Sequence, residues 1–248
     1  MRIALAQTKP KVRSCESNIA DHTRFTKIAI EDGCNCIVFP ELSLLGYEPK
    51  LARTSAIRSD APELARLQEL SDDSGCTIIL GAPLQGTQLP NIASITLAPS
   101  AQPTIYCKRI LHPDELPYFA AGRAKDSWVM ESPKTAIVIC FELSDDPLIE
   151  SACQAGAELL IASVAKHSKG MTAAHLRLSG IASRFQVPTL IVNSVGLQDG
   201  MDCSGGSAAW NRGGRLLTQL EDEEEGLLIV DVVAGELTTA KTRYLYAD

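Results

Sequence analysis

Glu41, Lys108 and Cys140 each follow a short run of apolar residues. A carboxylate that emerges from an apolar interior can act as a general base near neutral pH. A positioned ammonium group stabilises the oxyanion that forms when a carbonyl is attacked, and a cysteine thiol is a nucleophile for carbonyl carbon. The three residue types together predict covalent acyl chemistry on a small carbonyl compound.

Each of these residues also has an ordinary structural role, and taken singly that role is favoured for Glu41 and Lys108. Glu41 would cap the next helical turn, Lys108 would be a surface lysine, and Cys140 would be a buried core thiol. The three residues together indicate a catalytic site more strongly than any one of them, because sites in α/β proteins gather at the carboxyl ends of strands. Backbone N–H groups at the corner after Cys140, and the charge of Lys108, are expected to lower the pKa of the thiol.

The segments that carry these residues repeat one pattern, in which a helical stretch is followed by a Gly or Pro stop and a short apolar strand. Such strands are typical of sheets buried on both faces. The pattern predicts a layered α/β fold with mixed sheets, and no linker rich in Pro, Gly or Ser divides the chain, so residues 1–248 are expected to form a single domain. The expected helices are 14–31, 62–74, 147–155 and 171–185, and the expected strands are 3–6, 36–39, 77–80, 93–97, 104–107, 128–130, 135–139, 159–162, 189–192, 207–210, 216–219 and, last along the chain, 226–233.

The bulk composition argues against several classes of protein. The net charge of −7 is not that of a typical nucleic-acid-binding protein. No run approaches the roughly 20 apolar residues of a membrane span, and the apolar start is too short for a signal peptide, so a cytoplasmic protein that binds no membrane is expected. The eight cysteines contain no C-x-x-C motif, which favours free thiols. The four histidines have no recognisable zinc spacing with cysteine, so no metal site is expected.

Three segments resemble the signature regions of the nitrilase superfamily, the carbon–nitrogen hydrolases. They are residues 37–47 (IVFPELSLLGY), 106–108 (YCK) and 137–140 (IVIC). Residues 2–7, 204–207 and 213–214 also resemble the family, so the likeness spans nearly the whole chain. The resemblance implies a four-layer α-β-β-α sandwich with two mixed sheets, a homodimer or higher homo-oligomer, and no cofactor.

The resemblance also implies roles for the candidate residues. Glu41 would be the general base, Lys108 the oxyanion stabiliser and Cys140 the nucleophile that forms a thioester with the substrate. Glu115, within an E-x-x-Y-F-x-x-G pattern, would orient Lys108 or the substrate, and the backbone N–H of Phe141 would also hold the oxyanion.

The segment after the nucleophile departs from the family pattern. The family usually carries an aromatic residue and then Asp, whereas this chain has Phe141 and then Glu142. This difference leaves the substrate open. Further pocket residues are expected at Tyr47, Ser163, His167 and Asn193, because they lie in signature segments or follow buried strands.

The expected reaction is hydrolysis of a small amide with release of ammonia or an amine. Nitriles, carbamoyl compounds and ureido compounds remain open as substrates. Two alternatives keep the same fold: a catalytically silent binding or scaffold protein, and an acyltransferase or synthetase-linked glutaminase that uses the same thiol. The intact Glu41, Lys108 and Cys140 argue against the silent protein.

Overall fold

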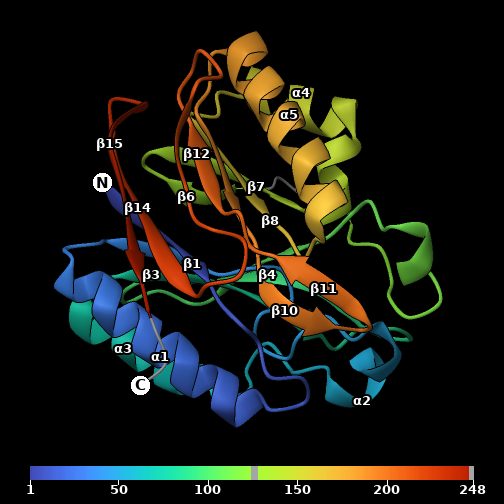
Figure 1. The fold of residues 1–248 in the computed structure, drawn as a ribbon. Helices are drawn as coiled ribbons and strands as arrows, with labels where there is room; N and C mark the ends of the chain where they lie inside the picture. The colour runs from blue at the N-terminus through green and yellow to red at the C-terminus, as the bar shows by residue number, and fades with distance from the viewer. Residues whose placement is uncertain (124–127, 246–248) are drawn as a thin grey trace.

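Two mixed β-sheets form the middle of the molecule (Figure 1). The computed structural model describes residues 1–123 and 128–245. Within these residues, one sheet has seven strands in the order β15 (Glu236–Tyr244), β14 (Gly226–Val233), β1 (Arg2–Gln7), β2 (Cys36–Val38), β3 (Thr77–Leu84), β4 (Asn91–Leu97) and β5 (Thr104–Cys107). The other has six, in the order β13 (Leu216–Gln219), β12 (Ala208–Trp210), β9 (Thr189–Val192), β8 (Leu159–Ser163), β7 (Lys134–Ile139) and β6 (Trp128–Glu131).

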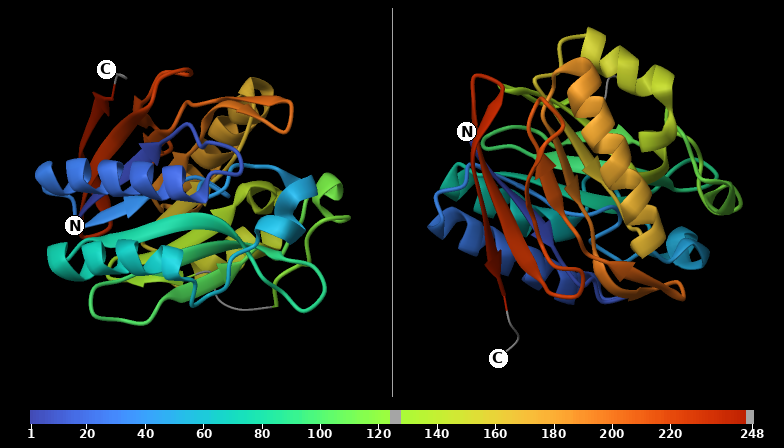
Figure 2. Two further views of the ribbon diagram at one scale, coloured as in Figure 1. Left: turned by 90° about the horizontal axis from the view of Figure 1, so that it is seen from below. Right: turned by 45° about the horizontal axis from the view of Figure 1, so that its top comes forward.

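Helices cover the outer face of each sheet. α1 (Cys15–Glu31) and α3 (Pro62–Ser74) pack on the seven-stranded sheet, and α4 (Asp146–Gln154) and α5 (Ser168–Phe185) pack on the six-stranded sheet. Figure 2 shows the two helix pairs on opposite sides of the molecule. The predicted α-β-β-α sandwich with two mixed sheets is confirmed. The short elements are α2 (Ala52–Ser55), η1 (Pro49–Leu51), η2 (Pro113–Glu115) and η3 (Cys140–Ser144).

Alternate residues of the central strands contribute to different layers of the core. In β1, Ile3 and Leu5 lie in the core between the two sheets, whereas Ala4 and Ala6 lie in the core beneath α1 and α3. This follows from the two-residue period of a strand. Both faces of the strand are covered, which explains why its sequence is apolar without alternation.

The strand directions bring strand ends to one edge of the molecule. β1, β2 and β3 are parallel, and β4 is antiparallel to both β3 and β5, so β5 runs in the same direction as β2. β2 and β5 therefore end at the same edge of their sheet, shortly before Glu41 and Lys108. In the other sheet, β7 is parallel to β8 and ends just before Cys140.

Three strands were not predicted. β15 follows β14, so the expectation that residues 226–233 are the last strand was wrong. Its sequence has two polar residues before Ala240 and three polar or charged residues after it, and the strand lies at the edge of the sheet, mostly exposed. β10 (Val195–Gln198) and β11 (Met201–Ser204) form a separate hairpin of four-residue strands, which is too short to show a clear periodicity.

Within residues 1–123 and 128–245, no helix is both long enough and apolar enough to cross a bilayer.

Candidate active site

The centre of the site is the ammonium group of Lys108, whose side chain is fully buried. Its Nζ donates hydrogen bonds to Glu41 Oε1 and to Glu115 Oε1, each at 2.7 Å. Burial alone would lower the pKa of Lys108, but the charges of Glu41, Cys140 and Glu115 raise it above the ordinary value. The lysine is therefore protonated at neutral pH. Two buried carboxylates thus share one buried cation, so the desolvated charge of Lys108 is paired within the chain.

The loop that carries Glu41 is fixed against β3. Phe39 N donates to Ile79 O at 2.8 Å, and Leu44 N donates to Gly81 O at 3.0 Å. The close approach requires glycine at position 81, because a Cβ there would lie 2.4 Å from both Pro40 O and Leu42 N. The position of the Glu41 carboxylate is thus set by the backbone of a neighbouring central strand.

Buried His22 supports the same loop from α1. Its Nε2 lies 3.0 Å from Ser43 Oγ and its Nδ1 lies 2.6 Å from Asn18 O, while the ring stacks on Phe39 with centroids 4.0 Å apart. A carbonyl oxygen accepts only, so Nδ1 carries the proton and Nε2 accepts from the serine hydroxyl. Burial lowers the pKa of His22 to about 4, and the ring is therefore neutral at physiological pH.

We expect His22 to make stability depend on pH. Its pKa is lower in the folded chain than the roughly 6.5 of an unfolded chain, so below about pH 6.5 the unfolded state binds more protons. The free energy of unfolding should then fall by an amount on the order of 2 kcal/mol between about pH 7 and about pH 4.5. Urea unfolding at both pH values measures this. His22→Gln, which does not titrate in this range, should lose that part of the pH dependence; an unchanged dependence in the variant would contradict the assignment.

Cys140 occupies a sharp corner between β7 and η3. Its φ is +48°, a left-handed backbone conformation that is strained for a residue with a side chain. The corner is held by Glu142, whose buried carboxylate accepts from Ile139 N at 2.8 Å, Arg109 N at 2.6 Å and the hydroxyl of Tyr106 at 2.8 Å. Glu142 thereby links the residue before Cys140 to the residues on either side of the Lys108 backbone. The longer side chain at this position has a positioning role in this chain.

The thiol of Cys140 is not acidic. Burial, followed by the charge of Glu41, raises its pKa to about 11, although Lys166 and Lys108 lower it. The expectation that its neighbours would depress this pKa below that of an ordinary thiol was wrong, because the desolvation and the nearby carboxylate outweigh the two lysines. A thiol with this pKa is protonated at neutral pH, so attack on a substrate requires a base.

Glu41 is the carboxylate with the largest effect on this thiol. Burial raises its pKa above that of an ordinary glutamate, although Lys108 lowers it, and the carboxylate also interacts with the Cys140 thiol. Its Oε2 is buried and accepts no hydrogen bond from any described nitrogen or oxygen donor. One carboxylate oxygen is therefore occupied by Lys108 and the other is available for a proton.

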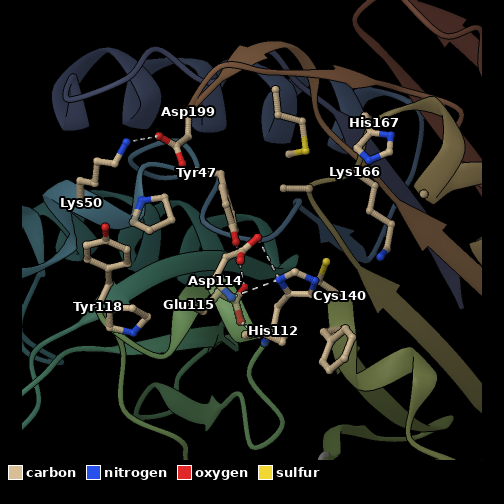
Figure 3. A pocket seen from close by; sticks show the side chains of 17 residues that line it. Tyr47, Lys50, His112, Asp114, Glu115, Tyr118, Cys140, Lys166, His167 and Asp199 are labelled. Carbon is tan, nitrogen blue, oxygen red and sulfur yellow. Dashed lines mark hydrogen bonds and ion pairs between the residues drawn. The ribbon is translucent and has the colours of Figure 1, made fainter.

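Cys140 lines a cavity of about 740 Å³ (Figure 3). Tyr47, Glu115, Phe141 and His167, four of the candidate site residues, also line it. The hydroxyl of Tyr47 donates to Glu115 Oε1 at 3.0 Å. Lys108 and Glu41 are fully buried and are not among the residues that line the cavity. Among the residues that the structure describes, no group of three or more His, Cys, Asp and Glu side chains could hold a metal ion.

Ser163 and Asn193 do not line this cavity, contrary to expectation. Ser163 Oγ donates to Phe39 O at 3.1 Å and so links the two sheets. Asn193 is fully buried, and its side-chain amide bonds to the backbone N and O of Lys166 and to Gly205 O, each at 2.9 Å. Both residues follow or end buried strands as predicted, but their polar groups are satisfied by backbone.

The β10–β11 hairpin contributes a wall of the cavity that the sequence did not predict. Asp199 and Met201 line the cavity from this hairpin. Gln198 Oε1 accepts from Tyr47 N at 2.7 Å, and Asp199 lies 3.7 Å from Lys50 Nζ in an ion pair. The one signal in the sequence was Asp199-Gly200, a dipeptide typical of a two-residue hairpin turn.

Comparison with known proteins gives a consistent family and fold. Residues 2–242 match the family model of carbon-nitrogen hydrolases. The glutamine-dependent NAD(+) synthetase of Synechocystis sp. is 30% identical over 271 aligned residues, which cover 96% of this chain and 48% of the synthetase. The chain thus spans about half the length of that relative.

Solved structures of an amidase from Nesterenkonia sp. AN1 share the fold. The NitN amidase superimposes with a TM-score of 0.85 and 23% identity, over 94% of this chain and 93% of that chain. An E-to-L mutant of this amidase, with the acetamide moiety of fluoroacetamide covalently added to its active-site cysteine, gives a TM-score of 0.84 and 22% identity, over 94% and 90% of the two chains. At this identity the likeness establishes the fold.

Proposed function

Because the chain belongs to the carbon-nitrogen hydrolase family, we propose that it is an amidase that hydrolyses a small amide and releases ammonia or an amine. One arrangement carries this proposal: Lys108 Nζ lies 2.7 Å from both Glu41 and Glu115, Glu41 interacts with the Cys140 thiol, and Glu115 and Cys140 line the same cavity. A base, a cation and a thiol thus meet at one site, which is the set of groups that covalent acyl chemistry requires.

The first half of the proposed reaction forms a thioester. Cys140 Sγ attacks the amide carbonyl carbon while Glu41 takes the thiol proton. Glu41 then gives this proton to the substrate nitrogen, the carbon–nitrogen bond breaks, and ammonia or an amine leaves. The raised pKa of Glu41 suits these proton transfers, because a carboxylate whose pKa lies nearer to neutral pH can both accept the thiol proton and donate it to the leaving nitrogen.

Two donors are available to the oxyanion that forms in the attack. An ammonium group has three N–H donors, and Lys108 uses two of them for the carboxylates, which leaves one for the substrate oxygen. The backbone N–H of Phe141 lies in the first turn of η3, where N–H groups have no partner within the helix. Each donor of this kind contributes roughly 3–4 kcal/mol to transition-state stabilisation.

The second half regenerates the enzyme. Glu41 takes a proton from water, the hydroxide attacks the thioester carbonyl, and the carbon–sulfur bond breaks to release a carboxylic acid. The proton returns from Glu41 to Cys140 Sγ. The covalent route replaces one difficult step with two easier ones.

A glutaminase is a second candidate. The 30% identity to a glutamine-dependent synthetase over 96% of this chain favours it. Glutamine carries a primary amide, so the same steps would release ammonia from it. If an amine in place of water attacked the thioester, the reaction would be acyl transfer and not hydrolysis.

The proposal is tested by ammonia release from a panel of small amides, glutamine, ureido compounds and nitriles. We expect release from at least one amide by the wild-type chain and none above background by Cys140→Ala. Hydroxylamine added to the same assay reveals acyl transfer as a hydroxamate. Cleavage of nitriles alone, or hydroxamate formation without hydrolysis, would contradict the amidase proposal, and folded protein without any turnover would favour the silent binding protein.

A further inference from the structure

The β10–β11 hairpin places one buried glutamine side chain beside the catalytic cavity. Gln198 is 1% exposed, whereas its neighbour Leu197 in the same strand is 68% exposed. Both polar atoms of the Gln198 amide are bonded, since Oε1 accepts from Tyr47 N at 2.7 Å and Nε2 donates to Cys203 Sγ at 3.6 Å. Gln198 itself does not line the cavity. Its amide therefore serves contacts within the chain and not a ligand.

Tyr47 is held at both of its ends. Gln198 accepts from its backbone N–H, and its hydroxyl donates to Glu115 Oε1 at 3.0 Å, as Figure 3 shows. The same oxygen of Glu115 accepts from Lys108 Nζ at 2.7 Å, and the other oxygen accepts from His112 N at 2.8 Å. Burial raises the pKa of Tyr47 far above that of an ordinary tyrosine. The hydroxyl therefore keeps its proton and remains a donor to Glu115.

The position of the Glu115 carboxylate bears on the direction of the Lys108 ammonium group. Lys108 Nζ donates to Glu115 and to Glu41, each at 2.7 Å. An ammonium group has three donors, so the directions of these two bonds set the direction of the third, which the proposed reaction gives to the oxyanion. Stabilisation of an oxyanion depends on donors that are positioned in advance. A Glu115 carboxylate without the Tyr47 hydroxyl would therefore hold the catalytic cation less well.

The base of the hairpin is fixed independently of Gln198. Val195, at the start of β10, donates its backbone N–H to Thr8 O at 2.9 Å. Gln198 lies at the other end of β10, next to the turn. A change at Gln198 should therefore release Tyr47 while the hairpin stays joined to the core at its base.

We propose that Gln198 is a positioning residue for the proposed hydrolysis and that it acts through Tyr47. Its amide holds Tyr47 where the hydroxyl reaches Glu115, and Glu115 in turn directs the ammonium group of Lys108. This inference rests on the proposed amidase function. Gln198 touches neither the cavity nor the reacting atoms, so its loss should lower kcat and leave KM nearly unchanged.

The first test is Gln198→Met, which replaces the amide by an unbranched apolar side chain of similar length. For an amide that the wild-type chain hydrolyses, kcat should fall by about tenfold, the size of effect of one lost hydrogen bond to a charged group. KM should change by less than about twofold. A raised KM with an unchanged kcat would overturn the proposal, because Gln198 would then only shape the cavity wall.

Leu197→Met is the matched control. It places the same methionine at the adjacent position of the same strand, where the side chain is exposed, and it should keep the wild-type kcat and KM. A similar loss of kcat in both variants would mean that any disturbance of the hairpin lowers activity. That result would also overturn the specific role of the Gln198 amide.

The order of action is tested by combining Gln198→Met with Tyr47→Phe, which removes the hydroxyl that reaches Glu115. If Gln198 acts through Tyr47, the double variant should have nearly the kcat of Tyr47→Phe alone, because the contact that Gln198 maintains is already absent. Two losses that multiply in the double variant would show that the residues act independently, and the proposal would be wrong.

Urea unfolding of the same four chains gives a readout that does not depend on turnover. Tyr47→Phe should lower the free energy of unfolding by no more than roughly half as much in Gln198→Met as in the wild-type background, because the hydroxyl is no longer held against Glu115. Equal losses in the two backgrounds would overturn the placement of Tyr47 by Gln198. If this coupling were present but the wild-type chain hydrolysed no amide, the proposed function would fail and the contact between the two residues would stand.

Discussion

Replacement of Cys140 by alanine is expected to lower amide hydrolysis by at least about a thousandfold, because no thioester can form without the thiol. The change removes one sulfur atom at a cavity wall and leaves Glu41, Lys108 and their hydrogen bonds in place. We therefore expect the variant to fold. Its thermal unfolding, followed by circular dichroism, should resemble that of the wild-type chain.

Cys153 offers a matched control for this experiment. It lies in α4, is partly buried, and burial raises its pKa to about 11, the same value as for Cys140. No carboxylate is among the groups that shift its pKa. Cys153→Ala should keep full activity.

Alkylation distinguishes the two thiols directly. If Glu41 activates Cys140, then iodoacetamide at neutral pH should modify Cys140 faster than Cys153, as measured by peptide mass spectrometry. Equal rates for the two thiols, or full activity in folded Cys140→Ala, would rule out Cys140 as the activated nucleophile.

Much of the fold could be predicted because both large sheets are buried on both faces. Strands β9 and β14 match the predicted ranges, since buried and mainly apolar runs bounded by Gly, Pro or polar residues leave little choice of ends. The strand β15 lacks that signal, because an edge strand with exposed side chains has a polar sequence. The β10–β11 hairpin depends on its contacts with Tyr47 and Glu48, which are distant in the sequence.

The positions of the candidate catalytic residues were predictable for a different reason. Lys108 and Cys140 directly follow β5 and β7, and Glu41 lies three residues after the end of β2. β2 and β5 end at the same edge of their sheet. Ser163 and Asn193 also stand at or near strand ends, yet their side chains turn to backbone groups. Position along a strand predicts where a residue lies but does not predict where its polar atoms find partners.

The raised pKa of Cys140 was unpredictable for a related reason. The sequence showed that a lysine and backbone N–H groups would be close, and both lower the pKa of a thiol. It did not show how completely the thiol would be enclosed, or that Glu41 would affect it more than Lys108. The balance of opposing effects depends on burial, which is a property of the folded chain.

The two carboxylates bonded to Lys108 are expected to differ sharply in their importance for catalysis. Glu41→Gln should lower kcat by about a thousandfold, the contribution of a general base, and Glu115→Gln by roughly tenfold, because a neutral amide oxygen still accepts a hydrogen bond from Lys108 but more weakly. Both carboxylates lie 2.7 Å from Lys108 Nζ. The two variants remove the same charge from the same cation, so they control for each other.

The pH dependence of the remaining activity tests the reason for this difference. In Glu41→Gln the thiol must lose its proton to water, and the pKa of Cys140 is about 11 in the intact site. The charge of Glu41 raises the pKa of Cys140, so in Glu41→Gln the thiol should have a somewhat lower pKa than in the wild-type chain. Below the pKa the thiolate fraction rises tenfold per pH unit, so kcat of Glu41→Gln should increase by roughly that factor per unit between about pH 7 and about pH 9. Glu115→Gln retains the base and should not show this steep increase.

These two measurements separate a base from a positioning group. If Glu41 acted only by orienting Lys108, as we propose for Glu115, both variants would lose similar activity and neither would recover at high pH. If Glu115 were the base, the steep increase would appear in Glu115→Gln instead. Glu41 interacts with the Cys140 thiol and has an unoccupied Oε2, whereas both oxygens of Glu115 accept hydrogen bonds. A large, pH-dependent loss confined to Glu41→Gln is therefore the result that this geometry requires.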